Sequence, residues 1–313
     1  MTRVAIQGAS GAFSHAAVIK ALGSDVEIVE CRTSEALFNA VLDGVALYGV
    51  VPIENTLAGS VQRNMDLLFL PEIHIIAEAR IRIRLCLAVQ PGRSIKEVRR
   101  VASHPVALQQ CHGFFSRNPQ IEAITAFDTA GSVRDLMAGD ADYDAAIGSE
   151  LAASLYGADV LEQNLEDHEQ NFTRFLTIAR DPIDLPEEGV KTSIAFTIQH
   201  RPGALHKALL VIAGHNVDLT RTESCPIAGR PREYRLYADL RAHSIINQSA
   251  RSRCAGNGYD RDPCPRTVPG GARGYLRSSP VARPGSAPHQ STCCIAKGTF
   301  PPCRQSGCKS SEQ

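Results

Sequence analysis

Short apolar runs alternate with segments of helical periodicity from residue 4 to about residue 179. Apolar runs of four to eight residues are typical of buried strands, and their alternation with helical segments is typical of βαβ units. The pattern therefore predicts a mainly parallel sheet, with strands at residues 4–7, 26–31, 49–53, 73–78, 82–89, 101–103, 123–127, 145–148 and 172–179.

Two helices between these strands carry clear end signals. Ser149 has the short polar side chain favoured at an N-cap, and the helix predicted after it runs to Tyr156. Gly157 follows at the position where a left-handed residue commonly ends a helix. Pro105 suits the first turn of another helix, because a first-turn residue needs no N–H.

A polar, proline-bearing segment at residues 181–189 predicts a linker between two domains. Beyond it, a strand is expected at residues 192–198, a helix from 202 to about 216, and strands at 217–224 and 233–240. This β-α-β-β order is two elements short of a ferredoxin-like unit. We therefore expect one domain at residues 1–182 and an incomplete one at 190–240.

The periodicity stops after Leu240. Residues 241–313 contain seven Leu, Ile, Val or Phe, eight prolines, and 11 Lys or Arg against three Asp or Glu. So little apolar content cannot form a packed core. We expect a disordered tail, and a shift of reading frame near Arg241 explains its sudden change of composition.

The neutral net charge of the chain is uneven, because the tail carries +8 and residues 1–240 therefore carry −8. An acidic main body argues against a nucleic-acid partner. The start of the chain lacks a secretion signal and no apolar run has membrane-spanning length, so we expect a soluble cytoplasmic protein without a membrane partner. Four scattered cysteines in the main body (Cys31, Cys86, Cys111 and Cys225) suit a reducing compartment. No cysteine or histidine spacing predicts a metal site.

The segment after the first strand, residues 8–15, is rich in small residues and precedes a helix. Its glycines would allow backbone N–H groups to approach an anion at the helix N-terminus, where the helix dipole favours negative charge. The spacing is not that of a dinucleotide-binding loop. A tight strand-to-helix turn without a ligand is the competing interpretation.

Polar residues also follow three other predicted strands, at Glu54 and Asn55, at Ser103, and at Asp128 and Thr129. The carboxyl ends of strands in open α/β sheets are where ligands bind, although ordinary helix capping also explains each turn taken singly. Near the start of a late strand lies Arg174, whose planar guanidinium suits a carboxylate as well as it suits a surface ion pair.

Taken together, these motifs resemble those of the prephenate dehydratase family over nearly all of residues 1–240. The motifs that carry the resemblance are Gly8-x-x-Gly11-x-Phe13-Ser14, Pro52-Ile53-Glu54-Asn55-Thr56-x-x-Gly59-x-Val61, Ser103-His104-Pro105-x-Ala107-Leu108-x-Gln110-Cys111, Asp128-Thr129-Ala130 and Asn171-x-Thr173-Arg174-Phe175. One departure is Val106, where Gln is common in the family.

The resemblance implies an α/β fold, in which a two-lobed, periplasmic-binding-protein-like catalytic domain encloses the substrate prephenate in a cleft and uses no cofactor. It assigns the departing hydroxyl of prephenate to Thr173, for which we select helpers from Ser103, Gln110, Asn55 and Glu54. Arg174 is expected to hold a substrate carboxylate, with the further binding residues Ser10, Gly11, Ser14, Asp128 and Thr129. Because strand side chains alternate, Thr173 and Arg174 reach one ligand only where the strand bends or ends.

Residues 191–240 resemble the family's ACT domain, an α+β regulatory unit that binds phenylalanine at a subunit interface. The resemblance places the phenylalanine-binding residues at Gly203, Ala204, Leu205, Glu223 and Ser224, and it implies a homo-oligomer, either dimer or tetramer. Three features depart from the ACT pattern: Cys225 replaces an Arg, His206 replaces a common Val, and the last helix and strand are missing. We therefore expect weak or absent regulation.

Two other functions remain open on the sequence. Arogenate dehydratase acts on the amino-acid analogue of prephenate, and the motifs do not separate the two substrates. A non-catalytic sensor of amino acids would keep the cleft and lose the chemistry. Retention of Thr173-Arg174 and Glu54-Asn55 argues against the sensor, because a protein that only binds its ligand needs no poised hydroxyl.

Overall fold

The computed structural model describes residues 1–182, 190–198, 201–214, 218–227, 229, 233–241 and 292–297. Before the tail, the chain divides between Leu185 and Pro186 into two compact units. No helix in these described stretches is long and apolar enough to cross a membrane.

The first lobe of the first unit is built on a mixed sheet with the strand order β2-β1-β3-β11-β5 and with β4 paired to β3. Its strands are β1 (Thr2–Gln7), β2 (Val26–Cys31), β3 (Tyr48–Asn55), β4 (Gly59–Ser60), β5 (His74–Arg82) and β11 (Phe172–Ala179). Its helices are α1 (Phe13–Leu22), α2 (Ser34–Leu42) and α3 (Gln62–Leu67). Part of its core consists of buried Val4, Ile6, Ala17, Val18, Val50 and Phe175, contributed by α1 and three strands.

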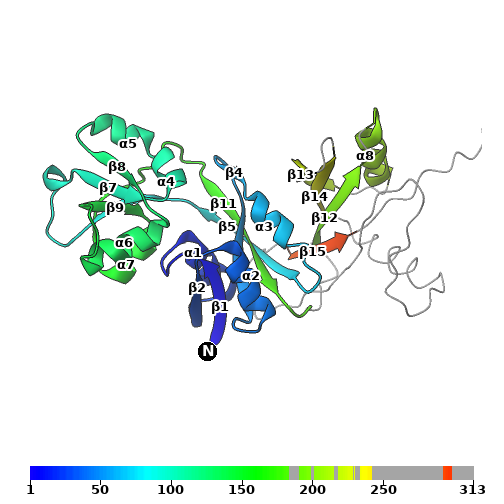
Figure 1. Cartoon of the computed structure of the whole chain (residues 1–313), viewed down its shortest axis with the longest axis horizontal. Coiled ribbons are helices and arrows are strands. Elements are labelled where there is room, and N and C mark those ends of the chain that lie inside the picture. Colours follow the sequence, from blue (N-terminus) through cyan, green and yellow to red (C-terminus); the bar gives the residue numbers. More distant parts are fainter. Residues whose placement is uncertain are drawn as a thin grey trace, which may run out of the picture. The chain divides into compact units, whose positions relative to one another are not determined.

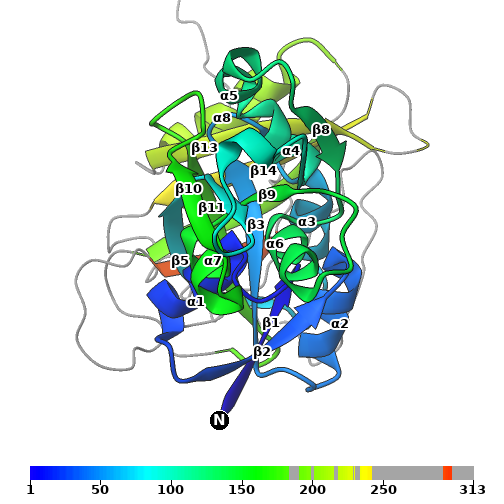
Figure 2. The ribbon, with the colours of Figure 1, turned by 90° about the vertical axis from the view of Figure 1, so that its left-hand side faces the viewer.

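The second lobe has a sheet of its own with the order β10-β6-β9-β7-β8. Its strands are β6 (Cys86–Val89), β7 (Arg100–Ser103), β8 (Glu122–Thr125), β9 (Ala145–Gly148) and β10 (Asp159–Gln163). Around them lie η1 (Ile95–Glu97), α4 (Pro105–Gln109), α5 (His112–Arg117), α6 (Thr129–Ala138) and α7 (Glu150–Tyr156). In the view of Figure 2, α6 and α7 lie together at the near side of the unit and pack against each other.

The chain crosses between the lobes twice, from β5 to β6 and back from β10 to β11 (Figure 1). Three hydrogen bonds join the two crossing segments. Ile83 N donates to Asn171 O at 2.8 Å, Leu165 N donates to Leu85 O at 2.9 Å, and Leu85 N donates to the Glu166 carboxylate at 2.9 Å. The two crossings therefore form one ladder, which brings residues 171–173 beside the entry to the second lobe.

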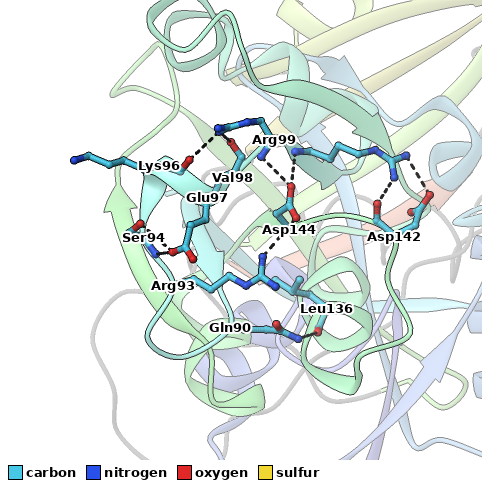
Figure 3. Close-up of polar contacts among 11 residues, drawn as sticks. Gln90, Arg93, Ser94, Lys96, Glu97, Val98, Arg99, Leu136, Asp142 and Asp144 are labelled. Atoms are coloured by element: carbon cyan, nitrogen blue, oxygen red, sulfur yellow. Dashed lines mark hydrogen bonds and ion pairs between the residues drawn. The ribbon is translucent and has the colours of Figure 1, made fainter.

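Asp144, which directly precedes β9, makes hydrogen bonds to the backbone at the start of β7 (Figure 3). Its Oδ2 accepts hydrogen bonds from Arg99 N at 2.9 Å and Arg100 N at 3.0 Å, and its Oδ1 lies 3.5 Å from the Arg93 guanidinium. The Arg100 guanidinium also contacts Asp142. One carboxylate thus takes up two backbone N–H groups at the beginning of β7, where polar groups need partners.

Several of the predicted elements are confirmed. The strands at residues 26–31, 145–148 and 172–179 have the expected bounds. Ser149 caps α7, because its side chain accepts a hydrogen bond from Ala152 N, and Gly157 ends that helix with a φ of 74°. Pro105 occupies the first turn of α4. Here capping and turn chemistry act locally, so the sequence alone predicts them.

Two features of the predicted first domain are wrong. The sheets are mixed rather than mainly parallel, because β11 runs antiparallel to both β3 and β5 and β6 runs antiparallel to both β9 and β10. The single strand predicted at residues 82–89 is the end of β5, a crossing and β6. Ile83 and Leu85 in the crossing are buried in the core of the second lobe, so the apolar run continues although the strand does not. The short strands β4 and β10 were not predicted.

The second unit contains β12 (Val190–Ile198), α8 (Ala204–Gly214), β13 (Asp218–Pro226) and β14 (Tyr234–Arg241), in the predicted β-α-β-β order. Both strand pairs, β12 with β14 and β13 with β14, are antiparallel. The prediction of a tail without regular structure is wrong at Thr292–Lys297, which forms β15 at the edge of this sheet, next to β12. The rest of the tail and most of the predicted linker lie outside the described residues.

Candidate functional site

Thr173 lies at the start of β11, where the strand leaves the crossing between the lobes. Its neighbours across the sheet are Asn55 on β3 and Ile81 on β5. Thr173 is 9% exposed, and Asn171, two positions earlier, is fully buried. Residues two apart on an extended chain point to the same face, so Asn171 and Thr173 share one side of the sheet.

The side chains of Asn55, Asn171 and Gln110 form a closed ring of amides next to Thr173. Asn55 Nδ2 donates to Asn171 Oδ1 at 2.7 Å, Asn171 Nδ2 donates to Gln110 Oε1 at 2.8 Å, and Gln110 Nε2 donates to Asn55 Oδ1 at 3.3 Å. Each amide therefore gives one hydrogen bond to the next and accepts one from the previous. These three residues together form the amide ring.

The amide ring presents a donor to the Thr173 hydroxyl. Asn55 Nδ2 donates to Thr173 Oγ1 at 3.0 Å. A hydroxyl has one donor and two acceptor positions, so a Thr173 oxygen that accepts from Asn55 keeps its own hydrogen for another acceptor. Donation to the oxygen also stabilises negative charge that grows on it when the hydrogen is given away.

Backbone groups around the ring hold Asn55 in one orientation. Its Oδ1 accepts from Leu57 N at 2.9 Å and from Ala58 N at 2.8 Å, as in an Asx turn. Thr56 ties the same turn to the crossing segment, because its Oγ1 donates to Gln170 O at 2.7 Å and accepts from Phe172 N at 3.0 Å. The turn after β3 and the start of β11 are therefore one rigid unit.

Arg174 points away from the amide ring. Its cross-strand neighbour is Glu54, and its guanidinium lies 2.8 Å from the Glu78 carboxylate and 3.7 Å from that of Glu54. The Arg174 and Glu78 side chains are 4% and 7% exposed. The register against β3 shifts only after Arg174, so the alternation of side chains still holds between Thr173 and Arg174. The two predicted site residues thus lie on opposite faces.

The segment between β1 and α1 contacts the second lobe. Ser149 Oγ donates to Gly11 O at 2.5 Å, Tyr156 Oη donates to Ser10 O at 2.9 Å, and Ala9 N donates to the Asp128 carboxylate at 2.8 Å. Gly11 has a φ of 89°, and a Cβ there would lie 2.7 Å from Ala152 Cα. Glycine is therefore needed for this close contact between the lobes.

Backbone N–H groups in the same segment already have protein partners. Besides Ala9 N, Ser10 N donates to a Glu30 carboxylate oxygen at 2.6 Å and Gly11 N donates to His15 Nδ1 at 3.0 Å. Burial lowers the pKa of His15, against the opposing effect of Glu30, which favours the neutral ring that can accept this bond. The anion-binding role predicted for Ser10 and Gly11 requires these bonds to be exchanged. Ser14, also predicted to bind, is buried in the first turn of α1.

Asp128 and Ser103 have structural partners in the second lobe. Asp128 caps α6 by accepting from Gly131 N at 3.0 Å, and Thr129 is the first residue of that helix. Ser103 is fully buried and donates to Ile147 O at 2.6 Å, which ties β7 to β9. Helix capping therefore describes the Asp128 turn, and the Ser103 hydroxyl already gives its hydrogen to a carbonyl.

Thr173, Asn55 and Gln110 are thus the predicted catalytic residues that the structure brings together. Glu54 lies on the Arg174 side, and Ser103 makes its hydrogen bond within the second lobe. Asn171 belongs to the cluster but had no assigned role in the sequence analysis. Its spacing of two from Thr173 on a strand was the signal that could have identified it.

Comparisons with known proteins agree on one family. The family model described as prephenate dehydratase matches residues 4–183. The chain is 38% identical to an Arabidopsis thaliana protein named arogenate dehydratase/prephenate dehydratase 2, over 80% of this chain and 68% of that protein. It is 36% identical to the bifunctional chorismate mutase/prephenate dehydratase of Escherichia coli, over 77% of this chain and 64% of the other. Against arogenate dehydratase 2 of Petunia hybrida the chain spans 57% of the relative's length.

Solved structures show a similar fold. A prephenate dehydratase from Arthrobacter aurescens, described in complex with L-Phe, matches with a TM-score of 0.70 and 26% identity, over 80% of this chain and 86% of that one. A protein described as GqqA, a novel type of quorum quenching acylase, matches with a TM-score of 0.68 and 33% identity, over 77% of this chain and 88% of the other. The predicted α/β class is confirmed, and the first unit has two sheets.

Proposed function

Because this chain belongs to the prephenate dehydratase family, we propose that it converts prephenate to phenylpyruvate, with loss of water and carbon dioxide. The observation that carries the proposal is the Thr173 hydroxyl, which accepts a hydrogen bond from Asn55 and keeps its own hydrogen for the substrate. The same reaction is a carbon–oxygen lyase step in phenylalanine biosynthesis.

The reaction requires an oriented substrate, a site that excludes water, and a hydrogen-bond donor at the leaving hydroxyl. Prephenate has a ring hydroxyl and a ring carboxylate, and loss of both makes the ring aromatic, which drives the reaction. The carboxylate leaves as carbon dioxide and its electron pair enters the ring. The hydroxyl leaves with its bonding pair and takes up a proton to become water. The protein's tasks are to orient the substrate, exclude water and donate to the leaving oxygen.

The amide ring suits the third task. An alcohol is a weak acid, so Thr173 gives its hydrogen only as hydroxide forms at the leaving group. Asn55 Nδ2 then stabilises the charge that grows on Thr173 Oγ1 at a distance of 3.0 Å. Gln110 and Asn171 hold Asn55 in place.

The residues that hold the two carboxylates of the substrate stay a prediction. Arg174 suits a carboxylate, but its guanidinium would have to exchange Glu78 and Glu54 for the substrate and reach the Thr173 face. Ser10, Gly11, Ser14, Asp128 and Thr129 lie at or near the contact between the lobes, and the N–H groups of Ser10 and Gly11 would have to exchange Glu30 and His15 for the substrate.

A turnover assay of the purified chain tests the proposal. Prephenate is supplied at neutral pH, and phenylpyruvate and carbon dioxide are measured together, with Thr173→Val as the matched control of low activity. We expect stoichiometric release of both products by the unmodified chain. Binding of prephenate without any phenylpyruvate would support the non-catalytic sensor instead.

Arogenate is the second candidate substrate, because the similar plant proteins carry arogenate dehydratase in their names. The two substrates differ in an amino-acid or keto-acid side chain, which lies away from the ring hydroxyl that Thr173 serves. Parallel assays that compare kcat/KM for the two substrates decide between them. A higher kcat/KM for arogenate would change the product to phenylalanine and leave the role of Thr173 intact.

The amide ring does not favour an acylase reaction of the kind named for one structural relative. Nucleophilic catalysis by a hydroxyl needs a neighbouring base that takes its hydrogen. The hydrogen bond described at Thr173 Oγ1 comes from an amide nitrogen, which cannot act as a base. We therefore favour a role for Thr173 as a donor.

We propose the second unit as the part of the chain at which phenylalanine would bind as a regulator. Gly203 has a left-handed φ of 76° directly before Ala204 and Leu205 of α8, and Glu223 and Ser224 lie on β13. Glu223 is already paired with Arg221, so a ligand ammonium would compete with that guanidinium. We therefore propose that phenylalanine regulates this chain weakly or not at all, and that the chain forms a dimer or a tetramer.

The free cysteines Cys31, Cys86, Cys111 and Cys225 suit a cytoplasmic location.

A further inference from the structure

Asn171 is fully buried and makes both of its side-chain hydrogen bonds within the amide ring. We propose that Asn171 is a positioning residue. It holds the Asn55 amide in the orientation that donates to Thr173, and it connects this hydrogen-bonded pair to Gln110 of the second lobe. The inference rests on the proposed function, since it concerns the donor for the same reaction. Asn171 itself acts through Asn55 and needs no contact with the substrate.

The direction of every hydrogen bond in the ring follows from the backbone. Leu57 N and Ala58 N both donate to Asn55 Oδ1, so this atom must be the carbonyl oxygen and Nδ2 must face Asn171 and Thr173. Asn171 then has to present its oxygen to Asn55 and its nitrogen to Gln110. A flipped Asn171 would place two nitrogens together at one contact and two oxygens at the other.

The ring also joins three parts of the first unit. Asn55 ends β3 of the first lobe, Asn171 lies in the returning crossing, and Gln110 is the C-cap of α4 in the second lobe. The bonds of Gln110 to Asn55 and Asn171 therefore form only when the lobes are together. The complete ring therefore requires contact between the two lobes.

Asn171→Asp tests the proposal, because protonation of the introduced carboxyl restores the missing donor. When ionised, this carboxylate has acceptors only and faces Gln110 Oε1, whereas the protonated form offers one O–H and one C=O, as the amide does. Burial raises the pKa of a carboxyl, so this change falls within the pH range of an assay. Asn39→Asp makes the same chemical change at an exposed position of α2 and is the control.

We expect kcat of Asn171→Asp to fall on the order of 10²-fold at pH 8, as for a misplaced catalytic group, with little change in KM. The loss should shrink as the pH is lowered, while the unmodified chain and Asn39→Asp show no such recovery. In a Thr173→Val background, Asn171→Asp should lower kcat little further, because the group it positions is already absent. Gln110→Glu, at a less buried position, should show the same recovery if Asn171→Asp folds poorly.

An unchanged kcat in Asn171→Asp would overturn the proposal. So would a loss that is independent of pH and equally large in the Thr173→Val background, because simple damage to the fold produces that pattern. These results are separable from failure of the proposed function, which would appear as absence of phenylpyruvate with the unmodified chain.

Discussion

The side chain of Thr173 shares its face of the sheet with amides, whereas the next residue pairs with carboxylates on the opposite face. A positioned proton donor typically contributes about 10²–10⁴-fold in rate. We expect Thr173→Val to lower kcat by a factor in this range with little effect on KM, measured by phenylpyruvate formation. Thr173→Ser keeps the hydroxyl and should retain most of the activity. A Thr173→Val enzyme with nearly normal kcat would move the donor elsewhere.

The contacts of Arg174 indicate a role in stability rather than in substrate binding. Removal of the guanidinium takes the 2.8 Å partner from the Glu78 carboxylate, whose side chain is 7% exposed, and leaves Arg80 at 4.0 Å. Breaking a buried ion pair from one side costs about 3–5 kcal/mol. We expect Arg174→Met to lower the free energy of unfolding by this amount in urea titrations, and Glu78→Gln in the same chain to restore part of it.

The control for Arg174 is Arg63→Met, which removes an exposed cation that pairs with Glu35 on the surface. Exposed pairs contribute little, so the unfolding free energy should change little. If Arg174 instead holds the substrate, KM of Arg174→Met rises strongly while the folded protein keeps its stability. That outcome would reinstate the carboxylate-binding role predicted from the sequence.

Among the elements, those with local signals were predictable. The α7 helix has Ser149 and Gly157 at its ends, and these act through contacts within a few residues. The direction of β11 was not predictable, because alternation of side chains is the same in parallel and antiparallel strands. The crossing at Ile83 and Leu85 was also not predictable from the pattern of apolar residues, because both residues are buried after the chain leaves the first sheet.

The same distinction holds for the candidate site. The motifs identified Thr173, Asn55 and Gln110, which meet in the structure. They also included Ser103, whose hydroxyl donates to a neighbouring strand, and Asp128, whose carboxylate caps a helix. A sequence pattern shows that a polar residue is placed at a strand end, but only tertiary contacts show whether a backbone group already occupies it.

Asp144 offers a test at the level of the sheet (Figure 3). It accepts from two backbone N–H groups at the start of β7, and hydrogen bonds to charged groups contribute about 1.5–3 kcal/mol each. We expect Asp144→Ala to lower the unfolding free energy by at least this amount in thermal or urea melts, with kcat unchanged in the folded fraction. Asp140→Ala, at an exposed position nearby, is the control. Equal stability of both variants would show that water replaces Asp144.

In the first unit as a whole, the two lobes meet through the segment between β1 and α1. Tyr156 Oη donates to Ser10 O at 2.9 Å across this contact, and burial raises the Tyr156 pKa, so the phenol keeps its hydrogen at neutral pH. Tyr156→Phe removes this one bond and little volume. A lost bond of about 1 kcal/mol lowers the ratio of closed to open molecules by about fivefold.

We therefore expect Tyr156→Phe to raise KM by up to about fivefold and to shift small-angle scattering of the free protein towards a larger radius of gyration. Tyr143→Phe is the matched control, because Tyr143 Oη donates to Ser132 O at 2.9 Å within the second lobe. Burial raises the pKa of Tyr143 to about 12, so it too remains a donor at neutral pH. The control should lose stability without a change in KM. If both variants alter KM equally, the contact through Ser10 does not govern closure. Closure would then depend on the other contacts between the lobes, which are Ser149 with Gly11, Asp128 with Ala9, and the amide ring through Gln110.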